Sequence, residues 1–96
     1  MKAVNLEFEW DENKNNSNID KHKIDFEFAS KVFADNQRIE WEDKRKDYGE
    51  KRFVTIGKII NTFVTVVYTM WGGAVRIISA RKAKKKQERD LYNNQN

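Results

Sequence analysis

The sequence predicts an α+β domain in which an antiparallel β-meander combines with two N-terminal helices and one C-terminal helix. Three observations predict this class. Apolar residues recur with helical spacing early in the chain, three β-rich segments follow residue 50, and the last segment is rich in lysine and arginine but lacks glycine. With 96 residues, of which 39% are hydrophobic, the chain suits one compact domain spanning residues 1–96.

The N-terminal half is expected to form a strand, two helices and a second strand, in that order. Apolar residues alternate with glutamates over residues 6–10, which is the spacing of a half-buried strand. Asp11 can cap a helix that ends near His22, and Asp25 can cap a second helix. Alternation resumes over residues 38–42. The apolar stripe of the second helix consists of Phe26, Ala29, Val32 and Phe33.

The first of these helices contains four asparagines and a serine, whose short side chains compete for the backbone and disfavour a helix. We therefore expect tertiary packing through Trp10 and Ile19 to hold it in place. Lys14, Asn18 and Lys21 fall at i, i+4 and i+7 on one helical face. This face can contact RNA or a protein partner, or it can simply be solvated.

The second half of the chain is expected to be a β-meander followed by a helix. Turns are predicted near Asn61 and at residues 72–73. The central strand carries β-branched and aromatic residues at both parities, so we expect both of its faces to be covered. Residues 80–92 are rich in good helix formers. The predicted strands are residues 52–60, 62–71 and 74–80.

The composition excludes several kinds of chemistry. Without cysteine there can be no disulfide framework, zinc ribbon or cysteine nucleophile, and His22, the single histidine, leaves no histidine cluster for a metal. We therefore expect no metal site and no cofactor. No apolar run reaches the roughly 18 to 20 residues of a membrane span, and the first ten residues carry acids where a signal peptide needs an apolar core. These features predict a cytoplasmic protein without membrane contact.

Charge is polarised along the chain. Residues 1–50 carry 9 Lys/Arg and 13 Asp/Glu, a net charge of −4, whereas residues 51–96 carry 10 and 2, a net charge of +8. This separation predicts an anionic partner for one face, with nucleic acid as the first choice. The densest basic segment, residues 76–89, can bind phosphates or form a solvated face. The lysines expected to contact RNA there are Lys82, Lys84 and Lys85.

Three arginines carry the strongest chemical hypothesis, because a charge in a β segment is unfavourable unless it has a partner or a purpose. In a meander, Arg52 and Arg76 can converge at one end of the sheet, and Arg81 follows on the same segment as Arg76. Their guanidinium groups offer paired donors to a phosphodiester. The alternative is an ion pair with Glu40, Glu42 or Glu50.

Other side chains are candidates for moving protons or binding a base. Histidine exchanges protons readily near neutral pH, so His22 is one candidate, although a lone histidine at a helix end can equally be a capping or packing residue. Glu50, two residues before Arg52, can deprotonate a hydroxyl or merely hold the arginine. Trp71 at the predicted hairpin tip can stack on a splayed base, or it can fold back over the sheet.

The order of residues resembles that of a known family. The pattern F-x-W-D-x-x-K-x-x-x-N-x-x-K-H-x-I-x-F-E-x-A-x-x-V-F-x-D runs from Phe8 to Asp35, and Y-G-E-x-R-F-x-x-I-G runs from Tyr48 to Gly57. These are followed by V-V-Y-T at residues 66–69 and R-I-I-S-A-R-x-A at residues 76–83. Together the motifs cover nearly the whole chain in the right order. The chain resembles the BrnT family, the ribonuclease toxins of type II toxin-antitoxin pairs.

The resemblance implies a RelE-like fold and a metal-independent endoribonuclease that inhibits translation. It also implies a BrnA-like antitoxin as partner, with DNA contacted only through the toxin-antitoxin complex. The functional candidates at matching positions are Arg52, Thr69, Arg76, Arg81, His22 and Lys21.

In the expected mechanism the 2′-hydroxyl of RNA attacks the adjacent phosphorus, the three arginines stabilise the developing charge, and His22 or Glu50 moves protons. Two other functions remain open from the residues alone. One is a nucleic-acid-binding module without catalysis, and the other is an interaction module whose basic helix docks an acidic chain.

Overall fold

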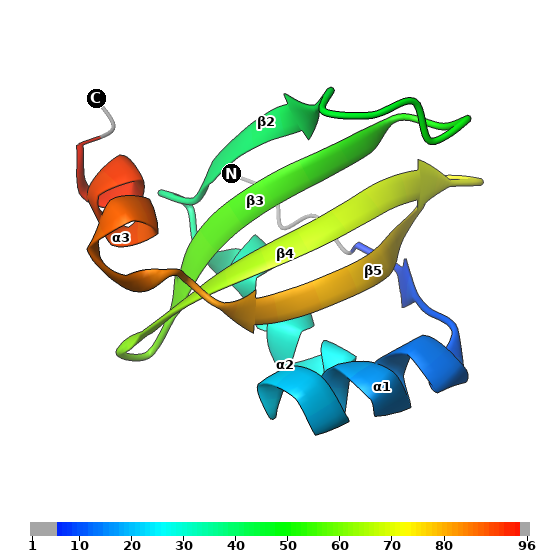
Figure 1. Ribbon diagram of the computed structural model, residues 1–96, viewed down its shortest axis with the longest axis horizontal. Helices are drawn as coiled ribbons and strands as arrows, with labels where there is room; N and C mark the ends of the chain where they lie inside the picture. Colours follow the sequence, from blue (N-terminus) through cyan, green and yellow to red (C-terminus); the bar gives the residue numbers. More distant parts are fainter. Residues whose placement is uncertain (1–5, 95–96) are drawn as a thin grey trace.

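The computed structural model describes residues 6–94, apart from the side chains of residues 85–87. A five-stranded sheet has the strand order β1-β5-β4-β3-β2. Figure 1 shows α1 and α2 beneath the β5 side of the sheet, while α3 lies beside the end at which β3 turns into β4. The elements are β1 (Phe8–Glu9), α1 (Glu12–His22), α2 (Phe26–Ala29), the 3₁₀ helix η1 (Ser30–Ala34), β2 (Ile39–Asp43), β3 (Arg52–Ile59), β4 (Thr62–Trp71), β5 (Ala74–Lys82) and α3 (Lys85–Asn93).

The sheet is mixed, so the expected all-antiparallel meander is wrong at one edge. β2, β3, β4 and β5 do pair sequentially and antiparallel. β1, however, pairs parallel with β5, with Phe8 opposite Val75 and Glu9 opposite Arg76. A parallel neighbour requires a long connection, which the helices and strands between β1 and β5 provide. β1 stops after two residues because Asp11 already caps the next helix.

The expectation of two N-terminal helices is also only partly correct. The second helix is a single α-helical turn that continues as the 3₁₀ helix η1. Phe26, Ala29 and Val32 are fully buried at intervals of three residues. Residues three apart share a face of an α-helical turn as well as of a 3₁₀ helix, so all three side chains stay on the sheet. The core between these helices and the sheet is completed by residues such as Val66, Tyr68 and Ile77.

The asparagines of α1 form tertiary contacts that the sequence did not predict. Asn18 is buried, and its amide pairs with the backbone of Ala80 on β5, accepting from its N–H at 3.1 Å and donating to its carbonyl at 2.7 Å. Asn15 accepts from the Phe26 N–H at 2.8 Å. Trp10 packs edge-on against Phe26 as expected, but Ile19 is 37% exposed, so its predicted packing role is wrong. Two asparagines therefore hold α1 against β5 and α2.

The C-terminal helix begins later than predicted. Residues 80–82 continue β5, and α3 starts at Lys85. Tyr92 fixes α3 to the rest of the fold, since its ring packs against Phe63 at a centroid distance of 5.1 Å and its hydroxyl donates to Asp35 at 2.7 Å. The strand extends at the expense of the predicted helix because Arg81 and Lys82 pair with Thr65 and Val64 of β4. The Ala83 N–H then donates to the Phe63 carbonyl at 2.8 Å.

Candidate active site

One cross-strand row on the sheet face opposite α1 and α2 collects several of the predicted site residues. Asp43 pairs with Arg52, and Thr69 pairs with Arg76. Phe53 pairs with Tyr68, so the preceding Arg52 and the following Thr69 also lie opposite each other. Tyr68 and Ile77 are in the core, and Phe53 packs against it. Because side chains alternate between the two faces of a strand, the row lies on the other face. We call this set the arginine row: Asp43, Arg52, Thr69, Arg76 and Glu9.

The two arginines of the row are held in the same way, by one aromatic ring and one acid each. The Arg52 guanidinium lies 4.1 Å from the Tyr48 ring centroid and donates to Glu50 at 3.2 Å. The Arg76 guanidinium lies 4.2 Å from the Trp71 centroid, with Glu9 at 3.7 Å. The side chains of Arg52 and Arg76 are 24% and 28% exposed, respectively. Ring stacking restricts each guanidinium while leaving it accessible to an anion.

Asp43 supports this arrangement, although the sequence did not single it out. Its carboxylate is buried and accepts two hydrogen bonds from the Arg45 side chain, both at 2.9 Å, and one from the Tyr48 hydroxyl at 3.1 Å. The hydrogen bonds from Arg45 hold the pKa of Asp43 far below its usual range. Asp43 thereby fixes the tyrosine on which Arg52 stacks. The sequence did carry a signal for Asp43. Alternation along the segment Ile39–Asp43 places Asp43 on the same face as Trp41.

Arg81 lies on the same face but outside the row. It pairs with Thr65 and forms two hydrogen bonds with Glu88 of α3, at 2.9 and 2.8 Å. Glu88 also accepts from the Thr65 hydroxyl at 2.7 Å and from the Lys84 N–H at 2.9 Å. Burial opposes the charged form of this carboxylate, but the hydrogen bonds outweigh that effect and lower the pKa of Glu88 to about 2. The acid of α3 therefore neutralises Arg81.

A β-bulge determines which residues of β5 face this surface. Val67 pairs with Ser79 but Tyr68 pairs with Ile77, so Ile78 is an extra residue on β5. The extra residue resets the alternation, and Ser79 consequently shares the face of Arg76 while Ala80 enters the core. Without the bulge, Arg81 would point to the opposite face. Simple alternation along the sequence could not predict this.

The remaining candidates are distributed around the sheet. His22 and Lys21 lie at the end of α1, far from the β2–β3 loop that carries Glu50 (Figure 1). Trp71 is 58% exposed and stacks with Arg76. The exposed lysines near the end of β5 are Lys82 and Lys84. The side chain of Lys85 lies outside the described residues.

Two further findings concern the described residues only. Among them, no group of three or more histidine, cysteine, aspartate or glutamate side chains is arranged so that it could hold a metal ion. Nor does any helix within residues 6–94 combine the length and apolar character needed to cross a bilayer.

The fold is that of a small α+β protein whose mixed sheet carries two stacked, partly exposed arginines on one face, an arrangement of the kind that suits an anion. The family model for BrnT, described as the ribonuclease toxin of type II toxin-antitoxin systems, matches residues 10–87. The chain belongs to this family of ribonuclease toxins, which act on RNA and are paired with an antitoxin. A search among curated proteins finds no match.

Proposed function

We propose that the chain is a metal-independent endoribonuclease that cuts single-stranded RNA at the arginine row. One observation carries the proposal, namely that Arg52 and Arg76 flank Thr69 on three neighbouring strands. Strands lie about 4.8 Å apart, so the two arginine backbones are about 10 Å apart. Two arginine side chains can span this gap toward one phosphate above β4. Their aromatic stacking and partial exposure suit that role.

The chemistry proposed at this phosphate uses the substrate's own 2′-hydroxyl as nucleophile. Its oxygen attacks the adjacent phosphorus, the bond from phosphorus to the 5′-oxygen breaks, and the products are a 2′,3′-cyclic phosphate and a 5′-hydroxyl. Arg52 and Arg76 donate to the non-bridging oxygens as negative charge develops, each contributing about 2–4 kcal/mol by analogy with other oxyanion donors. Thr69 acts as a positioning residue, since its hydroxyl donates to the Lys51 carbonyl at 2.6 Å.

Glu50 is the stronger candidate for the proton acceptor. It contacts Arg52, and its side chain is 46% exposed, so substrate can approach it directly. His22 is on α1, distant from the β2–β3 loop (Figure 1). We therefore assign the base to Glu50 and leave His22 a role in binding. A variant with Glu50→Gln should lose most cleavage while retaining RNA affinity.

The finer biological expectations rest on the family resemblance. We propose that the toxin inhibits translation in the cytoplasm and has a RelE-like fold. Its antitoxin would be of the BrnA class and would cover the basic face, so that DNA is contacted only through the complex. Arg81 would join RNA binding only when α3 releases it.

The proposal is tested with a synthetic single-stranded RNA in the presence of EDTA. Cleavage should proceed, yield cyclic phosphate ends, and fall by about 30-fold or more in both Arg52→Ala and Arg76→Ala. Lys31→Ala, which removes a positive charge from the helical side of the protein, is the matched control and should cleave normally. Binding is measured in parallel by fluorescence anisotropy.

Three results would contradict the proposal. Cleavage that stops on chelation would remove the metal-independent mechanism. Binding without any cleavage by the parent protein would favour a nucleic-acid-binding module. A parent that neither binds nor cuts RNA at low salt would favour a protein-interaction module.

A further inference from the structure

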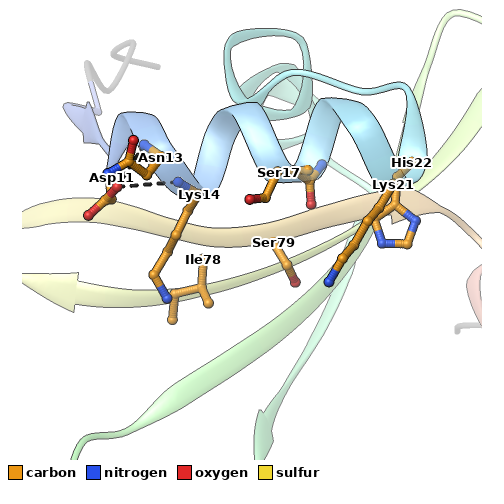
Figure 2. Close-up of a pocket in the computed structure, with 9 residues that line it drawn as sticks. Asp11, Asn13, Lys14, Ser17, Lys21, His22, Ile78 and Ser79 are labelled. Carbon is orange, nitrogen blue, oxygen red and sulfur yellow. Dashed lines mark hydrogen bonds between the residues drawn. The ribbon is translucent and has the colours of Figure 1, made fainter.

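A groove between α1 and β5 has no role in the chemistry proposed above. It has a volume of about 470 Å³. β1 pairs with β5 only as far as Arg76, so the following edge of β5 is lined by α1 instead of by a strand. Figure 2 shows Ile78 and Ser79 of β5 facing the side chains of Lys14 and Lys21 on α1.

The groove is cationic. Its basic side chains are Lys14 and Lys21, with His22 beside Lys21 (Figure 2). Asp11 is the acid that lines it, and this carboxylate is engaged in capping α1 through the N–H groups of Asn13 and Lys14. The hydroxyls of Ser17 and Ser79 add neutral hydrogen-bonding groups to the walls. Lysines and hydroxyls without a free carboxylate form an environment suited to phosphate.

One residue that lines the groove, Ser79, lies on the same sheet face as the arginine row. The bulge at Ile78 brings Ser79 onto the face that carries Arg76, three residues along the same strand. This separation corresponds to about 10 Å along β5. Lys14 and Lys21 are seven residues apart on α1, or about 10 Å along the helix, so they reach different phosphates of an extended strand.

From this geometry we propose that the α1–β5 groove binds the backbone phosphates that flank the scissile phosphate of the RNA substrate. The proposal rests on the proposed function for the position of the scissile phosphate. The RNA-binding site would then extend beyond the single phosphate that the arginine row contacts. Affinity for short and long RNA should therefore depend on different residues.

The test uses non-cleavable 2′-O-methyl oligonucleotides of four and twelve nucleotides, with binding measured by anisotropy over a range of salt concentrations. Lys14→Ala combined with Lys21→Ala removes two phosphate contacts. The slope of log K against log salt should fall by about 1.4 for the twelve-mer, and its affinity at 0.1 M salt by about 10- to 30-fold. Affinity for the four-mer should change by less than twofold.

The matched control is Lys31→Ala combined with Lys58→Ala, which removes the same charge from exposed lysines beside Tyr92. It should leave the salt slope for the twelve-mer unchanged. Equal losses in both double variants, or an unaltered slope in the groove variant, would overturn the proposal. So would an equal loss for the four-mer. Thermal melting confirms that each variant is folded.

The two proposals fail in distinguishable ways. If the parent cleaves RNA but the groove variant binds the twelve-mer normally, the groove proposal fails and the ribonuclease mechanism stands. If the parent binds the twelve-mer through the groove but does not cleave RNA, the mechanism fails and the groove proposal stands. A parent that binds neither oligonucleotide overturns both.

Discussion

Replacing Glu88 with Gln tests the link between α3 and the sheet. The carboxylate accepts hydrogen bonds from Arg81, Thr65 and the Lys84 N–H, which together lower the pKa of Glu88 from 4.5 to about 2 despite its burial. A folded-state pKa below the unfolded value contributes stability that is fully present above about pH 4.5. That contribution is lost as the pH falls toward 2, because the unfolded state takes up the proton first.

The expected magnitude follows from this pKa difference. The change in the pKa of Glu88 from 4.5 to about 2 corresponds to an upper value of about 3.4 kcal/mol. Because the Glu88 side chain is 18% exposed and Arg81 is 29% exposed, solvent screens the pair, and we expect about 1–2 kcal/mol. Gln retains the shape of Glu and resembles its protonated form. Glu88→Gln should therefore destabilise the fold at neutral pH and much less in acid.

Urea unfolding at pH 7 and pH 3 measures the effect. The difference in unfolding free energy between parent and Glu88→Gln should fall by more than half at the lower pH. Other acids with lowered pKa values, such as Asp43 and Asp35, cancel in this difference. Asp90→Asn, an exposed change in the same helix, is the control and should differ little from the parent at either pH. A difference for Glu88→Gln that is the same at both pH values would refute the reasoning.

The same variant reports on Arg81. If Arg81 binds RNA once Glu88 releases it, Glu88→Gln should bind RNA more tightly than the parent, with a salt slope steeper by about 0.7. An unchanged slope would mean that Arg81 serves only to hold α3.

Three stability predictions concern other parts of the fold, each measured as the free energy of unfolding in urea. Asn18→Ala leaves buried backbone groups of Ala80 unpaired and should cost about 2–4 kcal/mol; a loss below 1 kcal/mol would contradict this role. Gly57→Ala would place a Cβ 2.8 Å from that of Val32, so we expect stability to fall by about 1–3 kcal/mol. A neutral variant would contradict this close packing. Ile60 is 85% exposed and has a φ of 56°, a conformation that asparagine adopts more readily than isoleucine. Ile60→Asn should therefore stabilise the fold by about 0.5–1 kcal/mol, and a fall in stability would contradict this prediction.

Local patterns predicted much of the sheet. The expected strand over residues 62–71 has the bounds of β4, and the turn at residues 72–73 follows it. Asp11 and Asp25 cap α1 and α2 as expected. These features depend on neighbouring residues, through alternation and through side-chain bonds to nearby amides, so the sequence itself carries the information.

Part of the candidate site was also predictable. A meander requires neighbouring strands to share an end, and Arg52 and Arg76 do lie in one cross-strand row. The aromatic partners of these arginines were not predicted, nor was the buried carboxylate of Asp43. Their contacts depend on how the β2–β3 loop and the β4–β5 turn fold over the row, which no spacing rule specifies.

The sequence by itself determined an α+β domain with a basic C-terminal half, a capped first helix and a succession of antiparallel strands. Tertiary structure alone decided the parallel edge strand, the bulge at Ile78 and the pairing of Asn18 with Ala80. It also decided that Arg81 meets Glu88. The physical reason is that capping and alternation involve residues within one or two turns, whereas Asn18 and Ala80 are 62 residues apart and meet only after the core has formed.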